Sequence, residues 1–483
     1  MMILRQLRLA ALLILCVSLI SCAVNPVTGH KEFMLVSESQ EIAMGRDFYP
    51  NALWGDVGGG GEFRDERLKA YLADVVRRIH RVSHRPNLPV DFALQNSSVP
   101  NAWAIPGHVV MTRGLVAALD NEAEFAFVMG HEMGHVSARH SARQMSYGIL
   151  QQVGMGAAGL ALQGREYADA ALGIGAVGSS LLLLKYGRDD ELEADRLGID
   201  YLARLGYDPA SAVSAHRRLE KVSAEFLQAA GKNPRDKGFF EDLLSTHPRT
   251  SVRIDELQSM ISRTPPYPRA GDGLHRERLQ EMTAGVRKLH TIYMETYDKA
   301  LAAYQEKNLA EAESFAARAI SAAPDQPAFH TLKGFIMLKK KDYEGAERYF
   351  DTAIRIDRNY APAYRGKGTL MYFRERYSEG IGNLQKGLAL FPQDIPAHYF
   401  LGMSYYRTTQ YRNAIPHLNQ FAGVSPDHPE IHGILGICYE NAGDLPSAYQ
   451  HYIQQTRVAP ESEIGRHAAS RAAALKPVLE KRR

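Results

Sequence analysis

Two histidines and two glutamates are spaced so that they can assemble a metal site. Residues 131–135 read His-Glu-Met-Gly-His. On a helix, His131 and His135 are one turn apart on the same face, so both imidazole rings can reach one ion. Glu132 then lies beside that ion, where it can take a proton from water. A catalytic zinc ion also needs a third protein ligand and an open position. We expect Glu191 to be that ligand.

The residues around this motif predict that it lies on a buried helix. Asn121 is a favourable N-cap, and Glu124 follows three residues later, as in a capping box. Apolar residues then recur at helical spacing. They are Phe125, Val128, Met129, Met133 and Val136. A buried helix is the support that this chemistry requires.

A longer metal-binding pattern, HExxHxxGxxH, is not present in this sequence. His140 lies close to the place of the third histidine in that pattern, but position 138 is Ala and position 141 is Ser. We therefore expect the third ligand to be a distant glutamate, which again indicates Glu191.

Over about residues 25–262 the chain resembles the HtpX-like and CAAX-prenyl-protease-like zinc peptidases. The resemblance is carried by His-Glu-Met-Gly-His and by Arg-Asp-Asp-Glu-Leu-Glu-Ala-Asp at residues 188–195. A third motif is Thr-His-Pro at residues 246–248, with Arg253 after it. The resemblance implies an α+β domain of the gluzincin type with a small edge sheet.

The same resemblance implies a role for each residue of the site. His131, His135 and Glu191 would bind one Zn²⁺ per subunit, and Glu132 would be the general base. Asp195 would orient a ligand histidine or donate a proton. The spacing agrees, because Asp195 lies one helical turn after Glu191 and can face the same site. The alternative is that Glu191 and Asp195 are charges on an exposed helix face.

His247 is a further candidate catalytic residue. In the family, the His-Pro element can approach the metal, where it stabilises the developing oxyanion or occupies the open position. The alternative is a loop histidine that precedes Pro248 at the start of a helix.

Three short strands are expected before the motif. Residues 90–95, 102–105 and 109–113 have strand-like composition around a turn at Pro106-Gly107. Zinc peptidases commonly bind extended polypeptide along a sheet edge through main-chain hydrogen bonds. The family carries a similar segment, so we assign residues 101–113 to that edge. The expected substrate contacts in it are Asn101, Ile105 and Val109.

Residues 1–21 have the layout of a secretory signal. Two arginines precede an apolar run from Leu9 to Ile20, and this run is too short for a typical membrane-spanning helix. Residues 19–22, Leu-Ile-Ser-Cys, resemble a bacterial lipobox, which implies that Cys22 carries lipid. The alternative is an ordinary cleavable signal or an N-terminal anchor with an incidental cysteine.

The residue after Cys22 and the use of cysteine both favour the periplasm. Ala23 stands where aspartate would be the contrary signal, so analogy with Gram-negative lipoproteins favours the outer membrane. Cys16 would leave with the signal, and Cys438 would then have no cysteine partner for an intrachain disulfide.

Charge and hydropathy argue against two other classes of protein. The formal charge of +3 falls to about +1 when the signal leaves, so there is no electrostatic case for nucleic acid binding. The uncharged run from Ala170 to Leu184 is short and interrupted by glycines. We therefore expect residues 149–185 to form packed helices over the active site, with membrane contact as the alternative.

From about residue 293 the sequence repeats every 34 residues. Glycine stands at positions 334, 368, 402 and 436, and a small residue recurs at positions 312, 346, 380, 414 and 448. A large residue follows the small one by four positions in most repeats. This resembles the tetratricopeptide repeat, whose paired helices need small residues where they cross. We expect an α-solenoid, followed by a capping helix that Pro477 should shorten.

Stacked repeats form a concave surface suited to polypeptide, so we expect this solenoid to bind protein ligands. The residues expected to line the surface include Phe335, Tyr372, Tyr399 and Tyr406. They are aromatic rather than uniformly basic, which predicts extended hydrophobic or aromatic-rich ligands. The alternative is that the repeats only stabilise the enzyme.

The expected fold is mostly α, with the zinc peptidase domain followed by the α-solenoid. The expected divisions are a signal peptide (1–21), a peptidase domain (22–263), a linker and connecting helix (264–292), repeats (293–462) and a capping helix with a tail (463–483).

This combination resembles the periplasmic β-barrel assembly-enhancing proteases. That implies a zinc endopeptidase that binds outer-membrane β-barrel proteins or their assembly machinery and degrades misassembled molecules. The alternative is a periplasmic chaperone or assembly adaptor that acts through its repeats, with latent protease activity. A purely structural zinc ion is a weaker interpretation, because structural sites usually have four ligands rich in cysteine.

Overall fold

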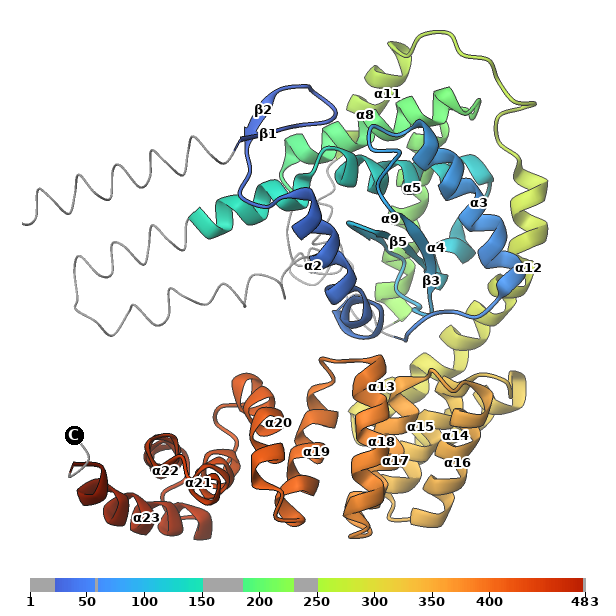
Figure 1. Cartoon of the computed structure of the whole chain (residues 1–483). Helices are drawn as coiled ribbons and strands as arrows, with labels where there is room; N and C mark the ends of the chain where they lie inside the picture. Colours follow the sequence, from blue (N-terminus) through green and yellow to red (C-terminus); the bar gives the residue numbers. More distant parts are fainter. Residues whose placement is uncertain (1–21, 57–59, 151–185, 230–250, 481–483) are drawn as a thin grey trace, which may run out of the picture. The chain divides into compact units, whose positions relative to one another are not determined.

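The computed structural model describes residues 22–56, 60–150, 186–229 and 251–480 (Figure 1). The chain divides into two compact units, residues 1–294 and 295–483. Each unit has buried apolar clusters of its own. The first unit carries the His-Glu-Met-Gly-His motif and a small sheet, and the second consists of helical repeats. The expected fold class is confirmed.

Within the described residues, no helix combines the length and the apolar character needed to cross a membrane. The expected signal at residues 1–21 lies outside these residues, and so does nearly all of the expected helical segment 149–185.

A three-stranded sheet packs against the helix that carries the motif. β3 (Asp91–Gln95) pairs in parallel with β5 (His108–Thr112), and β4 (Ala102–Ile105) pairs antiparallel with the other side of β5. The three predicted strands are therefore confirmed. The expectation that residues 101–113 form one edge is wrong for β5, because a strand with a neighbour on each side has no free edge. Among the described residues, the edges of this sheet are β3 and β4.

α5 (Glu122–Ser137) and α8 (Arg188–Arg204) pack closely because small residues line their contact. A Cβ atom added at Gly130 would lie 3.3 Å from the Cα atom of Gly198. One added at Gly134 would lie 3.0 Å from the Cα atom of Ala194. A larger side chain at either glycine would push the helices apart. The close approach brings the histidines of α5 beside the first turns of α8.

A side-chain hydrogen bond caps the start of α5. The Asn121 side chain accepts a hydrogen bond of 2.9 Å from the backbone N–H of Glu124, so the predicted N-cap is confirmed. Every residue of α5 is buried.

A buried carboxylate in the first turn of α5 ties this helix to its neighbours. Glu122 accepts hydrogen bonds of 2.5 Å from the hydroxyls of Tyr71 and Tyr207, and one of 2.8 Å from the Arg78 guanidinium. Burial alone would raise the pKa of Glu122, but these three donors hold it below its ordinary value. The ionised side chain therefore anchors the helix terminus at neutral pH.

The remaining elements of the first unit surround this centre (Figure 1). They are β1 (Cys22–Val24), β2 (Lys31–Phe33), α2 (Glu38–Asn51), the π-helix η1 (Ala52–Asp56), α3 (Glu66–Val82), α4 (Arg113–Ala118), α9 (Ser211–Ala229), α11 (Ser251–Ser262) and α12 (Arg276–Ile292).

α12 lies in the segment expected to be a linker and connecting helix, and it packs on the first unit. The Arg113 guanidinium lies 2.7 Å from His290 Nδ1, and Asn96 donates a hydrogen bond of 2.9 Å to the Tyr293 hydroxyl.

The second unit is built from antiparallel helix pairs with a final capping helix. The elements are η5 (Tyr293–Tyr297, at the junction of the units), α13 (Asp298–Gln305), α14 (Leu309–Ala322), α15 (Pro327–Lys339), α16 (Tyr343–Ile356), α17 (Ala361–Phe373), α18 (Tyr377–Leu390), α19 (Ile395–Arg407), α20 (Tyr411–Val424), α21 (Ile431–Ala442), α22 (Leu445–Val458) and α23 (Glu463–Glu480). A Cβ atom added at Gly334 would lie 2.6 Å from the Phe350 ring, and one at Gly436 would lie 2.4 Å from the Tyr452 ring. Small residues therefore stand where the paired helices cross, as the sequence predicts.

α23 continues through Pro477 to Glu480, so the expectation that this proline shortens the helix is wrong. A proline removes the hydrogen-bond partner of the carbonyl four residues earlier. That carbonyl belongs to Ala473, which is exposed, so water can satisfy it.

Candidate metal centre

The three expected metal ligands come together in the first unit. One ligand atom from each of His131, His135 and Glu191 lies within 4.8 Å of the others, and all three side chains are buried. The two Nε2 atoms are 3.1 Å apart. Glu191 places Oε2 3.6 Å from His131 Nε2 and Oε1 3.5 Å from His135 Nε2. The alternative of exposed charges on α8 is therefore wrong for Glu191 and equally for Asp195, which is fully buried.

This arrangement fits a metal ion. For ligand–zinc distances of about 2.0–2.2 Å, tetrahedral donor atoms lie roughly 3.3–3.6 Å apart. The distances of 3.1 to 3.6 Å between the donor atoms are close to that range. Two imidazole nitrogens and one carboxylate match the ligand set of catalytic zinc sites, which keep a fourth position open.

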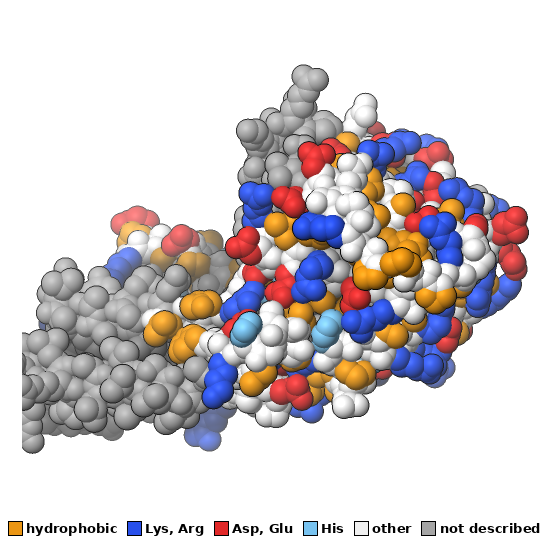
Figure 2. Space-filling view, turned by 90° about the horizontal axis from the view of Figure 1, so that it is seen from above, with side chains coloured by type: hydrophobic (Ala, Val, Ile, Leu, Met, Phe, Trp, Pro, Cys, Tyr) orange, Lys and Arg blue, Asp and Glu red, His pale blue; other side chains and the backbone are white. Residues whose placement is uncertain are grey.

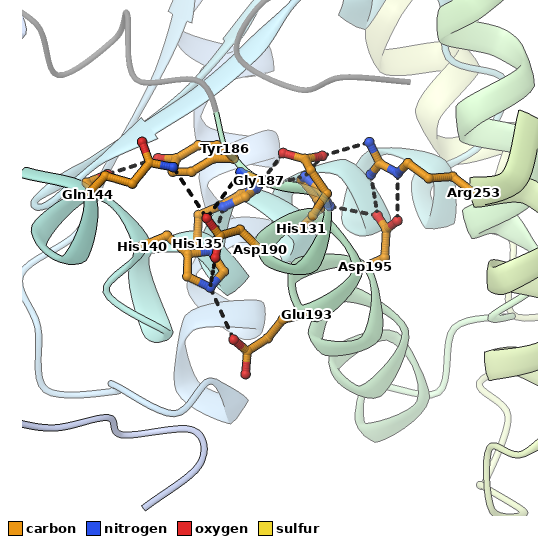
Figure 3. Close-up of polar contacts among 12 residues, drawn as sticks. His131, His135, His140, Gln144, Tyr186, Gly187, Asp190, Glu193, Asp195 and Arg253 are labelled. Carbon is orange, nitrogen blue, oxygen red and sulfur yellow. Dashed lines mark hydrogen bonds and ion pairs between the residues drawn. The ribbon is translucent and has the colours of Figure 1, made fainter. Parts of the chain in front are cut away.

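Asp195 orients one of the two histidines. His131 Nδ1 lies 2.8 Å from Asp195 Oδ1 (Figure 3). A carboxylate accepts this hydrogen bond, so the proton is on Nδ1 and the Nε2 lone pair faces Glu191. Of the two roles expected for Asp195, this geometry favours orientation of a ligand.

Arg253 connects both carboxylates of the site (Figure 3). Its guanidinium donates hydrogen bonds of 2.9 and 2.8 Å to Asp195, and it lies 2.7 Å from Glu191 Oε2. Burial alone would raise the pKa of Asp195, but Arg253 and hydrogen bonds from His131 and His216 hold it well below its usual range. The sequence motif contains Arg253 but predicts no role for it.

Two further residues that the sequence reasoning did not assign to the site contact His135. Tyr186 stacks on the His135 ring, with centroids 3.9 Å apart, and its hydroxyl lies 2.9 Å from Ser141 Oγ. Burial raises the pKa of Tyr186, so its hydroxyl is neutral at physiological pH. His140 lies 2.8 Å from His135 through the two Nδ1 atoms. The sequence could have suggested His140 only as a metal ligand, since no pattern indicates that it contacts His135.

The other predicted site residues have mixed outcomes. Val109 lies on the central strand with a fully buried side chain, so its assignment to a sheet edge is wrong. Asn101, just before the edge strand β4, and Ile105, the last residue of that strand, are also buried. His247 lies outside the described residues. Cys22 is the first residue of β1. Its lipidation stays a prediction.

The four aromatic residues predicted to bind ligands in the repeats are partly exposed. Phe335 and Arg365 line a pocket of about 530 Å³ in the second unit. Its lining is completed by Tyr304, Leu338, Lys339, Lys341, Tyr343, Thr369, Phe373, Pro396 and Phe400. Tyr372 borders the pocket, since its ring is 5.4 Å from that of Phe400. Tyr399 and Tyr406 are not part of its lining.

The exposed surface carries charges of both signs. On the face seen in Figure 2, acidic and basic side chains are interspersed with apolar ones over the described part of the chain.

Different protein-family models match the two structural units of the chain. Residues 66–261 match the model of peptidase family M48. Residues 303–369 and 399–456 match models of the tetratricopeptide repeat.

Several known proteins are similar in sequence to this chain. The β-barrel assembly-enhancing protease of Yersinia pestis is 29% identical over 251 residues, which are 51% of this chain and 49% of the relative. That of Escherichia coli K12 is 29% identical over 247 residues, or 50% of this chain and 48% of the relative. The mitochondrial metalloendopeptidase OMA1 of Schizosaccharomyces pombe is 26% identical over 49% of this chain and 65% of its own length. The chain thus spans about half the length of the bacterial relatives it matches.

Proposed function

We propose that this chain is a zinc-dependent endopeptidase of the bacterial periplasm, because residues 66–261 match the model of peptidase family M48 and tetratricopeptide repeats follow them. Its substrates would be misassembled outer-membrane proteins. The observation that carries the proposal is the buried cluster of His131, His135 and Glu191, with donor atoms 3.1 to 3.6 Å apart.

His131, His135 and Glu191 would hold the zinc ion. A zinc ion in such a site supplies Lewis acidity, which polarises a carbonyl group and lowers the pKa of water. Glu132, on α5 between the two histidines, takes a proton from water and passes it to the leaving amine. Asp195, held by Arg253, keeps His131 in the tautomer that presents Nε2.

The substrate would lie along the free edge of β4. The carbonyl of Asn101 accepts a hydrogen bond of 2.9 Å from the backbone N–H of Thr112, so the backbone polar groups of Asn101 face β5. The N–H and C=O of one residue point to the same side of an antiparallel strand, and this side alternates from residue to residue. The N–H and C=O of Ala104 therefore face the free edge, whereas those of Asn101 and Ile105 face β5. We assign the main-chain contact with an extended substrate to Ala104.

His247 completes the proposed catalytic residues. Its motif stands shortly before Arg253, which contacts both Asp195 and Glu191. Arg253 thus ties the start of α11 to the metal centre, and this supports a place for His247 near the metal.

The pocket in the second unit would hold polypeptide before cleavage. Its aromatic and apolar lining suits unfolded hydrophobic segments, and Phe335, Phe373 and Phe400 supply large contact surfaces. The names of the relatives from Yersinia pestis and Escherichia coli support outer-membrane β-barrel proteins or their assembly machinery as the partners.

A lipid on Cys22 would anchor the protein to the outer membrane, facing the periplasm. The Leu-Ile-Ser-Cys sequence supports this, as does the alanine that follows it. Metabolic labelling with a palmitate analogue, compared between wild type and Cys22→Ala, tests the anchor.

Cleavage of casein by the purified zinc-loaded protein tests the proposed activity. Wild type should cleave, and Glu132→Gln should bind zinc normally but lose about 10²–10⁴-fold in rate. If both cleave equally, the proposed mechanism is wrong. If neither cleaves and Glu132→Gln still restores outer-membrane assembly in cells, a chaperone or adaptor function replaces it.

A further inference from the structure

His140 lies in the metal centre without being one of the three clustered ligands. It lies three residues after the end of α5, and its side chain is fully buried. Its Nδ1 lies 2.8 Å from His135 Nδ1, and its Nε2 lies 3.2 Å from Glu193 Oε2 (Figure 3). The next carboxylate, Asp190, is farther away, with Oδ1 at 3.8 Å from Nε2. His140 thus stands between a carboxylate of α8 and one of the metal ligands.

The backbone explains how His140 reaches this place. α5 ends at Ser137, and Arg139 adopts a left-handed conformation with φ of 57°. The Arg139 side chain is held there by Glu41, at 3.1 Å, and by the carbonyl of Val36, at 2.9 Å. Non-glycine residues seldom adopt this conformation, and those that do are usually held by their surroundings. This turn directs the following residue back toward the histidines of α5.

The hydrogen-bond chain has one consistent assignment for neutral rings. An ionised carboxylate only accepts, so His140 Nε2 carries a proton and donates it to Glu193. A neutral imidazole then has its lone pair on Nδ1, so His140 Nδ1 is an acceptor. His135 Nδ1 must therefore carry the proton of the 2.8 Å contact. The lone pair of His135 is left on Nε2, the atom 3.5 Å from Glu191 Oε1.

We propose that His140, supported by Glu193, is a positioning residue that fixes His135 in its metal-binding tautomer. Asp195 does the same for His131 by direct contact at 2.8 Å. The two ligands thus receive the same tautomer by different routes, one through a carboxylate and one through a second imidazole.

The position of Glu193 explains why an intermediary is present. Asp195 is one turn after Glu191 and faces the metal centre, whereas Glu193 is about 200° around the helix from Glu191. Glu193 is also partly exposed, with 19% of its side chain accessible, while Asp195 is fully buried. His140 therefore links Glu193 to His135 through two hydrogen bonds, which fix the tautomer of His135.

Zinc affinity, measured by competition with a chelator, tests this inference, which rests on the proposed zinc site. His140→Leu should weaken zinc binding on the order of 10–100-fold. His140→Asn should retain most of the affinity, since its side-chain oxygen can replace Nδ1 as acceptor. His290→Leu removes a partly buried histidine of α12 that contacts Arg113 rather than His135, and it should leave zinc affinity unchanged. The inference is overturned if the folded His140→Leu protein binds zinc as wild type does, or if His140→Asn is equally weakened.

A second measurement needs no variant and no metal. Long-range ¹⁵N–¹H spectra of the metal-free, histidine-labelled wild type report which nitrogen of each ring carries the proton. We expect Nδ1 for His135 and Nε2 for His140, and a proton on His135 Nε2 overturns the inference. Failure of wild type to bind zinc would instead contradict the proposed function, and the tautomers would still be measurable.

Discussion

Arg253 and Asp195 form a buried pair joined by two hydrogen bonds, of 2.9 and 2.8 Å. Asp195 in turn accepts the hydrogen bond of His131. The pair therefore connects α11, which starts at Ser251, to the proposed metal ligand His131 on α5. Both charged side chains are buried, so each needs the other to compensate for the loss of hydration.

Removing Arg253 should destabilise the first unit strongly. Arg253→Met leaves the buried carboxylates of Asp195 and Glu191 without their shared cation, which should cost about 3–5 kcal/mol in the free energy of unfolding. Urea denaturation followed by tryptophan fluorescence measures this, since Trp54 and Trp103 are both in the first unit. Arg188→Met is the matched control. Its partner Glu256 is 3.9 Å away, and the two side chains are 65% and 40% accessible, so its loss should cost under about 1 kcal/mol. Equal effects of the two substitutions would contradict this account of Arg253.

The Glu122 anchor predicts a dependence of stability on acid pH. Its pKa is lower in the folded state than its ordinary value of 4.5, so the ionised form stabilises the fold. That stability is fully present above about pH 4.5 and is lost as the pH falls through the lower folded value. Tyr207→Phe removes one donor and should cost about 1–3 kcal/mol at pH 7.

Urea denaturation at pH 7 and pH 4 compares Tyr207→Phe with Tyr267→Phe. The Tyr267 hydroxyl contacts the exposed Arg269 at 3.2 Å and is not part of the anchor. We expect stability to change only for Tyr207→Phe, with a smaller penalty at pH 4. A penalty that stays the same at both pH values would show that the hydroxyl does not act through an ionised Glu122.

The repeat pocket predicts which aromatic residues bind unfolded polypeptide. Phe400→Ala should weaken binding of a hydrophobic peptide more than tenfold, because large aromatic residues in pockets dominate such interfaces.

The double substitution Tyr399→Ala with Tyr406→Ala tests the groove expected from the sequence, because these two tyrosines lie outside the pocket lining. Val424→Ala, at a residue with 65% exposure, is the control. Fluorescence anisotropy of a labelled peptide measures the affinities. If Phe400→Ala bound the peptide as wild type does, the pocket would not be the binding site for polypeptide.

Paired histidines predict that the repeats loosen in acid. His417 Nδ1 lies 2.9 Å from His398 Nδ1, and His451 Nδ1 lies 3.0 Å from His432 Nδ1. Burial and the neighbouring histidine lower the pKa of His417, and likewise of His451, to about 4. Since the folded pKa is below the unfolded value, the stability is present above about pH 6.5 and is lost as the pH falls toward 4.

Hydrogen exchange of the full chain measures this loss locally. After correction for the intrinsic rate, α19 through α22 should exchange faster at pH 5 than at pH 7. His417→Gln with His451→Gln should reduce that difference, because glutamine does not titrate in this range. A difference that is unchanged in the variant would assign the effect to other groups.

The sequence predicts the local structure well because local rules determine it. The Asn121 cap, the three strands and the small residues at the crossings of the repeat helices all follow from residue types at fixed spacing. The sequence also predicts that Glu191 lies beside His131, because the motifs at residues 131–135 and 188–195 occur together in a family of zinc peptidases.

Most of the failures concern contacts between segments that are distant in sequence, and one concerns a proline within a helix. The sequence places Val109 in a strand but does not give the order β3-β5-β4, which makes that strand central. His140 is near the ligands in sequence, yet its role depends on the left-handed turn at Arg139 and on Glu193 from another helix. Pro477 lies within a helix because an exposed carbonyl can bond to water, which the sequence pattern does not reveal.

The most direct test of the central claim is the zinc content of purified protein, measured by mass spectrometry, for wild type, Glu132→Gln and Glu191→Ala. We expect one zinc ion per chain in wild type and Glu132→Gln, and much weaker binding in Glu191→Ala because the carboxylate ligand is lost. Full zinc content with wild-type affinity in Glu191→Ala would contradict the account.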